Sequence, residues 1–313
     1  TELGASVAWR LGLNGPYKFT AKSNSEARDL FYRYDAIGRF QAIEAARAAA
    51  ATPGVAMSAP STDARDFIQY VALGRAILQA QEQSPELDAY LPRRAATEAS
   101  GSAPNDNGAF VHDGVARRSV VIIDEIDKAS RDFMNDLLEE LEQMTFSVPE
   151  LVHVGARAPR ITDRAYWPVV FLTSNAERAF PEPFLRRCLY FHIPFPAAEP
   201  QSGDRASLHY NLENLVALRL GEGRAAFART PLIYDAIRLF AQLREEPLHK
   251  KPSTAELLNW IATLKIAGCI QEESASSTNN RDAVLECALI TLLKSDEDQA
   301  AGRGDPGLRQ RRL

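Results

Sequence analysis

Two adjacent carboxylates, Asp124 and Glu125, directly follow the apolar run at residues 120–123. The β-branched residues of this run predict a strand that is buried on both faces, as strands inside parallel sheets are. The two acids then lie at the carboxyl end of the strand, where open α/β sheets bind their ligands. One carboxylate at such an edge can hold a divalent cation through water, and its neighbour can activate a water molecule for attack.

An apolar strand that ends in Asp-Glu is the Walker B pattern of ATPases. In that interpretation Asp124 holds Mg²⁺ through water and Glu125 activates the attacking water. The alternative is a buried strand that enters an ordinary acidic loop. Polar residues further along the chain decide between the two interpretations.

A second apolar run, at residues 169–172, is followed closely by Asn175. A neutral amide at a strand end can hold the lytic water and touch the γ-phosphate of a nucleotide. The alternative is a turn residue that caps its own backbone. We favour the first interpretation, because the strand with the Asp-Glu pair lies upstream.

Arg186 and Arg187 precede a third predicted strand at residues 189–193. An arginine that stabilises the charge of a transferring phosphoryl group is worth about 10³–10⁵ in rate. The alternative is a pair of surface arginines that form ion pairs with Glu182. The adjacent strand and the aromatic-proline exit after it favour the catalytic interpretation.

The other elements are predicted from apolar residues at helical or strand spacing. A short strand is expected at residues 17–20. Helices are expected at residues 1–11, 36–51, 63–83 and after Ala129, and then, beyond a polar linker at 197–204, at 208–220, 231–244, 252–270 and 281–294. Residues 95–107 predict a surface loop whose role the sequence does not give. The charged segment 295–313 predicts a disordered tail.

The bulk composition of the 313 residues is that of a globular protein, with 45% hydrophobic and 25% charged residues. A net charge of −5 gives no global basic field, so nucleic acid is not an expected partner. Cys188, Cys269 and Cys287 form no CxxC pair, which suits a reducing cytoplasm. No apolar run has the length of about 20 residues that a membrane span needs, so no membrane partner is expected.

The order of these features resembles that of the AAA+ ATPases, in particular the MoxR-like branch, over roughly residues 1–270. The most specific parts are the run at 122–128, Leu172-Thr173-Ser174-Asn175, and Pro183-Phe184-Leu185-Arg186-Arg187 before the segment 191–196. Residues 29–35 also look like the stretch after the second strand of MoxR-like proteins. The resemblance implies an α/β P-loop NTPase core at residues 1–196 and an α-helical lid at residues 205–294.

The resemblance also implies roles for single residues. Asn175 resembles sensor 1, and Arg187 resembles the arginine finger that reaches into the nucleotide of a neighbouring subunit, with Arg186 as the other candidate. Arg187 is preferred because the finger of MoxR-like proteins directly precedes the residue that opens this strand. The sensor 2 arginine has no counterpart, and Lys251, beside Lys250, is either its substitute on the γ-phosphate or a solvated lysine.

The largest departure from the family is the absence of a GxxxxGK[ST] motif from the sequence. Thr1 and the residues after it resemble the segment that comes directly after the P-loop lysine, so Thr1 would be the Walker A threonine and a Mg²⁺ ligand. We therefore expect a fragment whose phosphate-binding loop lies upstream. The family's sheet order is 5-1-4-3-2, so loss of the first strand would separate the strand near Leu189 from the strand near Val169 and leave both with an unpaired edge. Such a chain should bind ATP poorly.

Three functions are compatible with these features. The first is a Mg²⁺-dependent ATPase that assembles into a ring, a hexamer, and remodels a protein client, as MoxR-like proteins do beside von Willebrand A-domain partners. The second is a nucleic-acid-linked AAA+ motor or GTPase, which the acidic composition disfavours. The third is a degenerate module that does not hydrolyse nucleotide.

Overall fold

The computed structural model describes residues 2–51, 61–92, 110–154, 158–175, 178–198, 211–220 and 230–304. The chain divides into two compact units, Thr1–Tyr190 and Phe191–Leu313. Thr1 and the loop at 95–107 lie outside the described residues. Within the described part of the chain, every helix is too short or too polar to cross a membrane.

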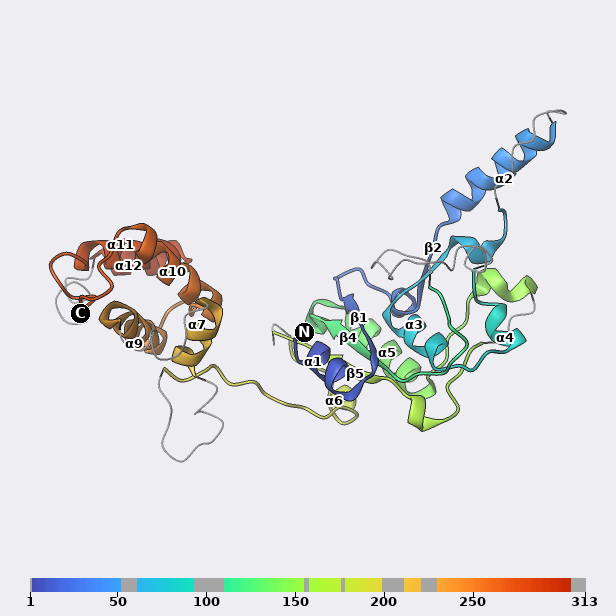
Figure 1. Cartoon of the computed structure of the whole chain (residues 1–313), viewed down its shortest axis with the longest axis horizontal. Coiled ribbons are helices and arrows are strands. Elements are labelled where there is room, and N and C mark those ends of the chain that lie inside the picture. The colour runs from blue at the N-terminus through green and yellow to red at the C-terminus, as the bar shows by residue number, and fades with distance from the viewer. Residues whose placement is uncertain are drawn as a thin grey trace. The chain divides into compact units, whose positions relative to one another are not determined.

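The described part of the first unit is built on a three-stranded parallel sheet with the order β1-β4-β5. The strands are β1 (Asn14–Thr20), β4 (Ser119–Asp124) and β5 (Val169–Leu172), which lie side by side in Figure 1. Thr20 pairs with Asp124, and Ile123 pairs with Leu172. Residues 120–123 are at most 1% exposed. The prediction of an α/β fold with a buried, parallel central strand is therefore confirmed.

Helices α1 (Glu2–Leu11), α3 (Ala72–Gln79) and α5 (Arg131–Gln143) pack on this sheet or its core. Helix α5 begins after Ser130, whose hydroxyl accepts from the Phe133 N–H at 3.1 Å, and it buries an apolar face on the core. The shorter elements are η1 (Ala27–Leu30), η2 (Ala64–Phe67), α4 (Pro85–Asp88), η4 (Ile126–Lys128), η5 (Pro149–Val154), η6 (Arg164–Tyr166) and α6 (Glu182–Leu185).

A small antiparallel sheet is formed by the strands β2 (Tyr32–Tyr34) and β3 (Ile68–Tyr70). Helix α2 (Ala36–Ala51) follows β2 in the sequence and extends away from the body of the first unit in Figure 1. The prediction of one helix over residues 63–83 is wrong in its first part, where η2 and β3 form instead. Ile68 and Tyr70 are buried and Gln69 is exposed, so the side chains alternate because β3 pairs with β2.

The predicted third strand at residues 189–193 is also wrong, because no strand forms there. Leu189 and Phe191 are fully and largely exposed, at 104% and 81% of their reference residue surface. A strand needs a hydrogen-bonded neighbour for its backbone groups, and among the described residues no strand pairs with this segment. The boundary between the two units falls inside it.

The second unit is helical. It contains α7 (Leu212–Leu220), α9 (Pro231–Glu245), α10 (Thr254–Ile266), α11 (Arg281–Thr291) and α12 (Asp296–Gly304). Its own core includes Trp260, Phe240 and Leu257, each at most 1% exposed. The prediction of disorder from residue 295 onward is wrong for α12, where Asp298 in the first turn accepts the backbone N–H groups of His249 and Lys250.

We expect Gly74→Ala to destabilise the first unit, because α3 lies directly against the backbone of Phe31, the residue between η1 and β2. A Cβ at Gly74 would lie 2.0 Å from the backbone oxygen of Phe31, an atom that already accepts from the Val71 N–H at 2.8 Å. The free energy of unfolding should fall by about 3 kcal/mol, measured by urea denaturation. Gly302→Ala in α12 is the matched control, since its Cβ meets only terminal methyl groups of Leu289 and Leu293. Equal stability of the two variants would contradict this packing.

Candidate functional site

The polar residues that follow β4 and β5 meet at the carboxyl edge of the parallel sheet. Asp124 is the last residue of β4, and Thr173 directly follows β5. The Thr173 hydroxyl donates a hydrogen bond to Asp124 Oδ1, and Lys18 Nζ of β1 lies 2.7 Å from Asp124 Oδ2. Both oxygens of this carboxylate are therefore held, one by each neighbouring strand.

Glu125 is fixed by an unusual backbone conformation. Its φ and ψ are 56° and 42°, in the left-handed region that residues other than glycine seldom adopt. The turn brings the Glu125 N–H to 3.1 Å from Thr173 Oγ1 and the Ile126 N–H to 3.0 Å from the Thr173 carbonyl oxygen. The carboxylate itself forms an ion pair with Lys128, at 2.8 Å. Strain of this kind is common where a side chain has to be held in place for function.

Asn175 is held beside the two acids through its backbone. Its N–H donates to Oδ2 of Asp127 at 3.2 Å, and Asp127 is 1% exposed. The Asn175 residue itself is exposed. The structure therefore places the backbone of Asn175 at the same edge as Asp124 and Glu125, and the water-holding role of its side-chain amide stays a prediction.

The charges around Asp124 favour its ionised form. The Lys18 ammonium, and then the Thr173 hydroxyl, hold the pKa of Asp124 below its ordinary value, while partial burial acts in the opposite direction. A lowered pKa stabilises the folded protein at pH values above the ordinary value of about 3.9. This contribution is lost as the pH falls through the lowered pKa of the folded state.

The donor set of this edge suits a magnesium ion that brings most of its own ligands. The described residues contain no group of three or more histidine, cysteine or acidic side chains that could enclose a metal ion. Mg²⁺ is usually held by one or two carboxylates, with water and substrate phosphates as the other ligands. Asp124 and Glu125 meet that requirement, and Asp124 is the more firmly positioned, because Lys18 and Thr173 each hold one of its carboxylate oxygens.

Arg186 and Arg187 follow the short helix α6 and form ion pairs within the same chain. Arg186 pairs with Glu182, as the alternative interpretation of the sequence expected, and Arg187 pairs with Glu142 of α5. Arg187 also donates to the Pro183 carbonyl oxygen at 3.2 Å. The two side chains are 74% and 48% exposed, so both ion pairs are in contact with water. The structure thus keeps both arginines accessible and brings neither to Asp124.

The remaining predicted site residue in the described chain, Lys251, belongs to the second unit and is exposed. It precedes α10, which begins with a capping box in which Ser253 and Glu256 bond each other's backbone N–H groups. Thr1, the predicted metal ligand, lies outside the described residues. The roles of Thr1 and Lys251 therefore stay predictions.

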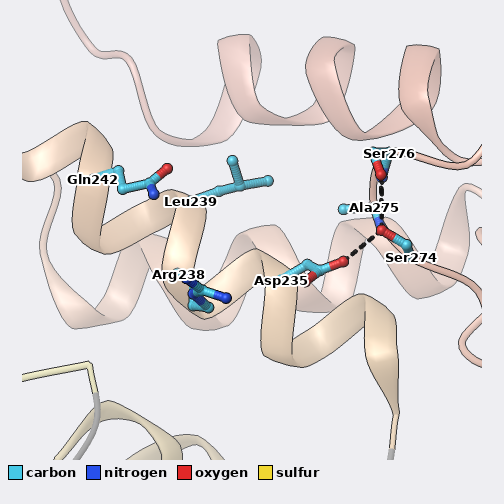
Figure 2. Close-up of a pocket in the computed structure, with 7 residues that line it drawn as sticks. All are labelled: Asp235, Arg238, Leu239, Gln242, Ser274, Ala275 and Ser276. Atoms are coloured by element: carbon cyan, nitrogen blue, oxygen red, sulfur yellow. Dashed lines mark hydrogen bonds between the residues drawn. The ribbon is translucent and has the colours of Figure 1, made fainter. Parts of the chain in front are cut away.

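A pocket of about 190 Å³ lies in the second unit, between α9 and the loop before α11. Figure 2 shows Asp235 of α9 bonded to Ser274, whose hydroxyl lies 2.7 Å from the carboxylate. Asp235 also accepts from the Ala275 N–H at 3.1 Å. The carboxylate therefore serves to fix the loop, and none of the predicted site residues lines this pocket.

Lys18 is the site residue that the sequence did not indicate, and Thr173, Asp127 and Lys128 were noticed only as parts of motifs. Lys18 was expected to be an ordinary strand residue. Its contact with Asp124 follows from the parallel pairing of β1 with β4, in which Lys18 lies opposite Ile122 and Thr20 opposite Asp124. Alternation along β1 and a lysine near its carboxyl end were the available signals.

Comparisons with protein-family models and with curated proteins return no match for this chain. The geometry of the site therefore carries the functional argument.

We expect Thr173→Val to raise the pKa of Asp124 toward its ordinary value, because the hydroxyl that stabilises the carboxylate is removed. The same change deprives the Glu125 N–H of its acceptor, so the free energy of unfolding at neutral pH should fall by about 1–3 kcal/mol. The Asp124 part of that loss should diminish as the pH falls through the lowered pKa of the folded state, because the carboxyl group then becomes protonated in the folded protein as well. Urea denaturation across this pH range and NMR titration of the Asp124 carboxyl carbon measure the two effects.

Thr173→Ser is the matched control, since it keeps the hydroxyl group. An Asp124 pKa that is the same in the valine, serine and unaltered proteins would show that Thr173 does not stabilise the carboxylate.

Proposed function

We propose that this chain carries the metal-facing and water-facing part of a Mg²⁺-dependent ATPase site of the AAA+ type, in a protein of the MoxR-like branch. The observation that carries the proposal is the joint position of Asp124, Glu125 and Asn175 at one edge of a parallel sheet. Adjacent carboxylates can serve a metal and a water molecule, and the amide can orient that water. An ordinary acidic loop does not require this arrangement.

The strand order supports the same proposal. The AAA+ order 5-1-4-3-2 contains the contiguous set 4-3-2, and β5, β4 and β1 of this chain are adjacent in the corresponding sequence order. In both arrangements the Asp-Glu strand is the middle member of the three. The helical second unit corresponds to the lid that the resemblance implies.

The residues of this edge have different tasks in the proposed reaction. Asp124 would hold the hydrated Mg²⁺, which would neutralise negative charge on the nucleotide phosphates. Glu125 accepts a proton from the attacking water, and Asn175 holds that water in line. Thr173 positions both acids through its hydroxyl group. Catalysis at such a site depends mostly on positioning and on neutralisation of charge.

The proposal requires phosphate-binding residues that the sequence does not contain in the form of a GxxxxGK[ST] motif. They have to be supplied by residues outside these 313. Nucleotide experiments should therefore use the full product of the gene, with this chain alone as the comparison. Tight binding of Mg-ATP by this chain alone would contradict the requirement.

The arginine finger is proposed to act on the nucleotide of a neighbouring subunit in a ring, a hexamer. If Arg187 is the finger it first has to leave Glu142, and if Arg186 is the finger it has to leave Glu182. Exposed ion pairs are worth about 0–1 kcal/mol, so a phosphate group can displace either carboxylate at little cost. Lys251 is proposed as a further contact with the γ-phosphate. The work done is proposed to be remodelling of a protein client in the cytoplasm, with a von Willebrand A-domain protein as a partner.

A second candidate is a related module that does not hydrolyse nucleotide. The ion pairs Lys18–Asp124 and Lys128–Glu125 favour it, because each of the two acids already has a cation beside it. Measurement of ATP turnover by the full gene product distinguishes the two candidates. Turnover in the presence of Mg²⁺ supports the ATPase, whereas nucleotide binding without turnover supports the module.

We expect Glu125→Gln, in the full gene product, to lower ATP turnover by about 10²–10⁴-fold, because an amide cannot accept the proton of the attacking water. ATP binding should be retained, since the side chain keeps its size and shape. Steady-state phosphate release and nucleotide binding measure the two quantities. Glu139→Gln on the exposed face of α5 is the matched control and should leave both unchanged. Undiminished turnover of Glu125→Gln removes Glu125 from this role.

We expect Arg187→Ala to lower turnover by about 10³-fold, in keeping with the worth of an arginine finger. Subunits with Arg187→Ala mixed with subunits with Glu125→Gln should recover part of the activity. Recovery arises because an interface between the two kinds of subunit can combine an intact Glu125 with an intact Arg187. A mixture that stays inactive contradicts action between subunits, and loss of turnover in Arg186→Ala alone transfers the role to Arg186.

A further inference from the structure

Lys18 takes up the oxygen of Asp124 that a metal ion would use. Its Nζ lies 2.7 Å from Asp124 Oδ2, and Oδ1 already accepts from the Thr173 hydroxyl. Thr173 carries no charge, and its hydroxyl can stay in place beside a cation. The ammonium group of Lys18 cannot, because it would lie against a divalent ion on the same carboxylate.

We propose that Lys18 is an internal counter-ion that competes with the divalent cation for Asp124, so that metal binding requires Lys18 to move away. Only the assignment of Asp124 as the metal-holding carboxylate rests on the proposed function. The competition follows from the position of Lys18 in this chain.

The Lys18 side chain is able to make this movement. It is 47% exposed, whereas the Asp124 side chain is 17% exposed, so the lysine can move into water while the carboxylate stays in position. The lysine stem is flexible, with a strongly hydrated charge at its end. Binding through a water molecule does not avoid the competition, since the hydrated divalent cation would still lie beside the ammonium group of Lys18 on the same carboxylate.

The competition has a consequence for selectivity. A free cation has to displace Lys18 using one carboxylate and the edge residues alone. A cation that arrives bound to an anionic phosphate compound brings negative charge, which offsets the repulsion from the displaced ammonium group. Lys18 therefore favours entry of a metal–phosphate complex over entry of the free metal ion.

Manganese is a suitable probe, because bound Mn²⁺ broadens the NMR signals of nearby backbone amides. We expect Lys18→Met to lower the Mn²⁺ concentration that half-broadens the amides of Glu125 and Thr173 by about threefold to tenfold. Lys22→Met removes the same charge from an exposed side chain of the loop after β1, and should shift that concentration less than about twofold. Lys18→Arg keeps the charge and should resemble the unaltered protein.

Asp124→Asn added to Lys18→Met should abolish the gain, which places the metal on Asp124. Equal effects of Lys18→Met and Lys22→Met, a gain that survives Asp124→Asn, or no broadening at these amides in any variant would each overturn the proposal. Amide spectra recorded without metal confirm that each variant is folded. If Lys18→Met does not fold, Lys18→Gln replaces it.

This test is independent of nucleotide turnover. A gain in Mn²⁺ affinity without any ATPase activity of the full gene product would leave the competition standing and remove the proposed function. ATPase activity of the full gene product without an effect of Lys18→Met on Mn²⁺ binding would support the proposed function and overturn the competition.

Discussion

The double pairing of β4 is the constraint on which the first unit depends. This strand is hydrogen-bonded to β1 on one edge and to β5 on the other, and residues 120–123 are at most 1% exposed. The interior positions 120–123 of such a strand have no room for an unpaired polar side chain. Polar side chains are therefore confined to its two terminal residues, Ser119 and Asp124, and parallel pairing brings the carboxyl ends of the neighbouring strands to the same edge as Asp124. The position of Asp124 follows from this packing.

The sequence predicted the parts of this arrangement that are encoded locally. Four apolar residues before Asp124 marked β4, and Ser130 followed by apolar residues at helical spacing marked α5. Segments whose structure depends on a hydrogen-bonded neighbouring strand were predicted less well. The segment 67–78 carries apolar residues at helical spacing, yet residues 68–70 form β3 because β2 lies beside them. The segment at 189–193 has the composition of a strand, but composition does not supply a hydrogen-bonded neighbour.

The residues of the candidate site also differ in whether the sequence could identify them. Asp124, Glu125 and Asn175 were identifiable because each stands at the end of an apolar run. Lys18 was not, because its contact with Asp124 joins residues far apart in the sequence and depends on the register of β1 against β4. A shift of one residue in that register would turn the Lys18 side chain to the other face of the sheet. Local patterns therefore reveal the acids of such a site more readily than the cations that balance them.

The two acids differ in how strongly they are restrained, and this difference bears on their tasks. Asp124 is bonded through its side chain to two strands, so its carboxylate has little freedom to move. Glu125 is restrained mainly through its backbone, by the left-handed turn and the bond from its N–H to Thr173. Its one described side-chain partner, Lys128, is 42% exposed. A group that orients a fixed cation benefits from the first kind of restraint, because misplacement weakens electrostatic stabilisation. A proton acceptor has to approach a water molecule and then release the proton, and the second kind of restraint leaves its carboxylate free to do so.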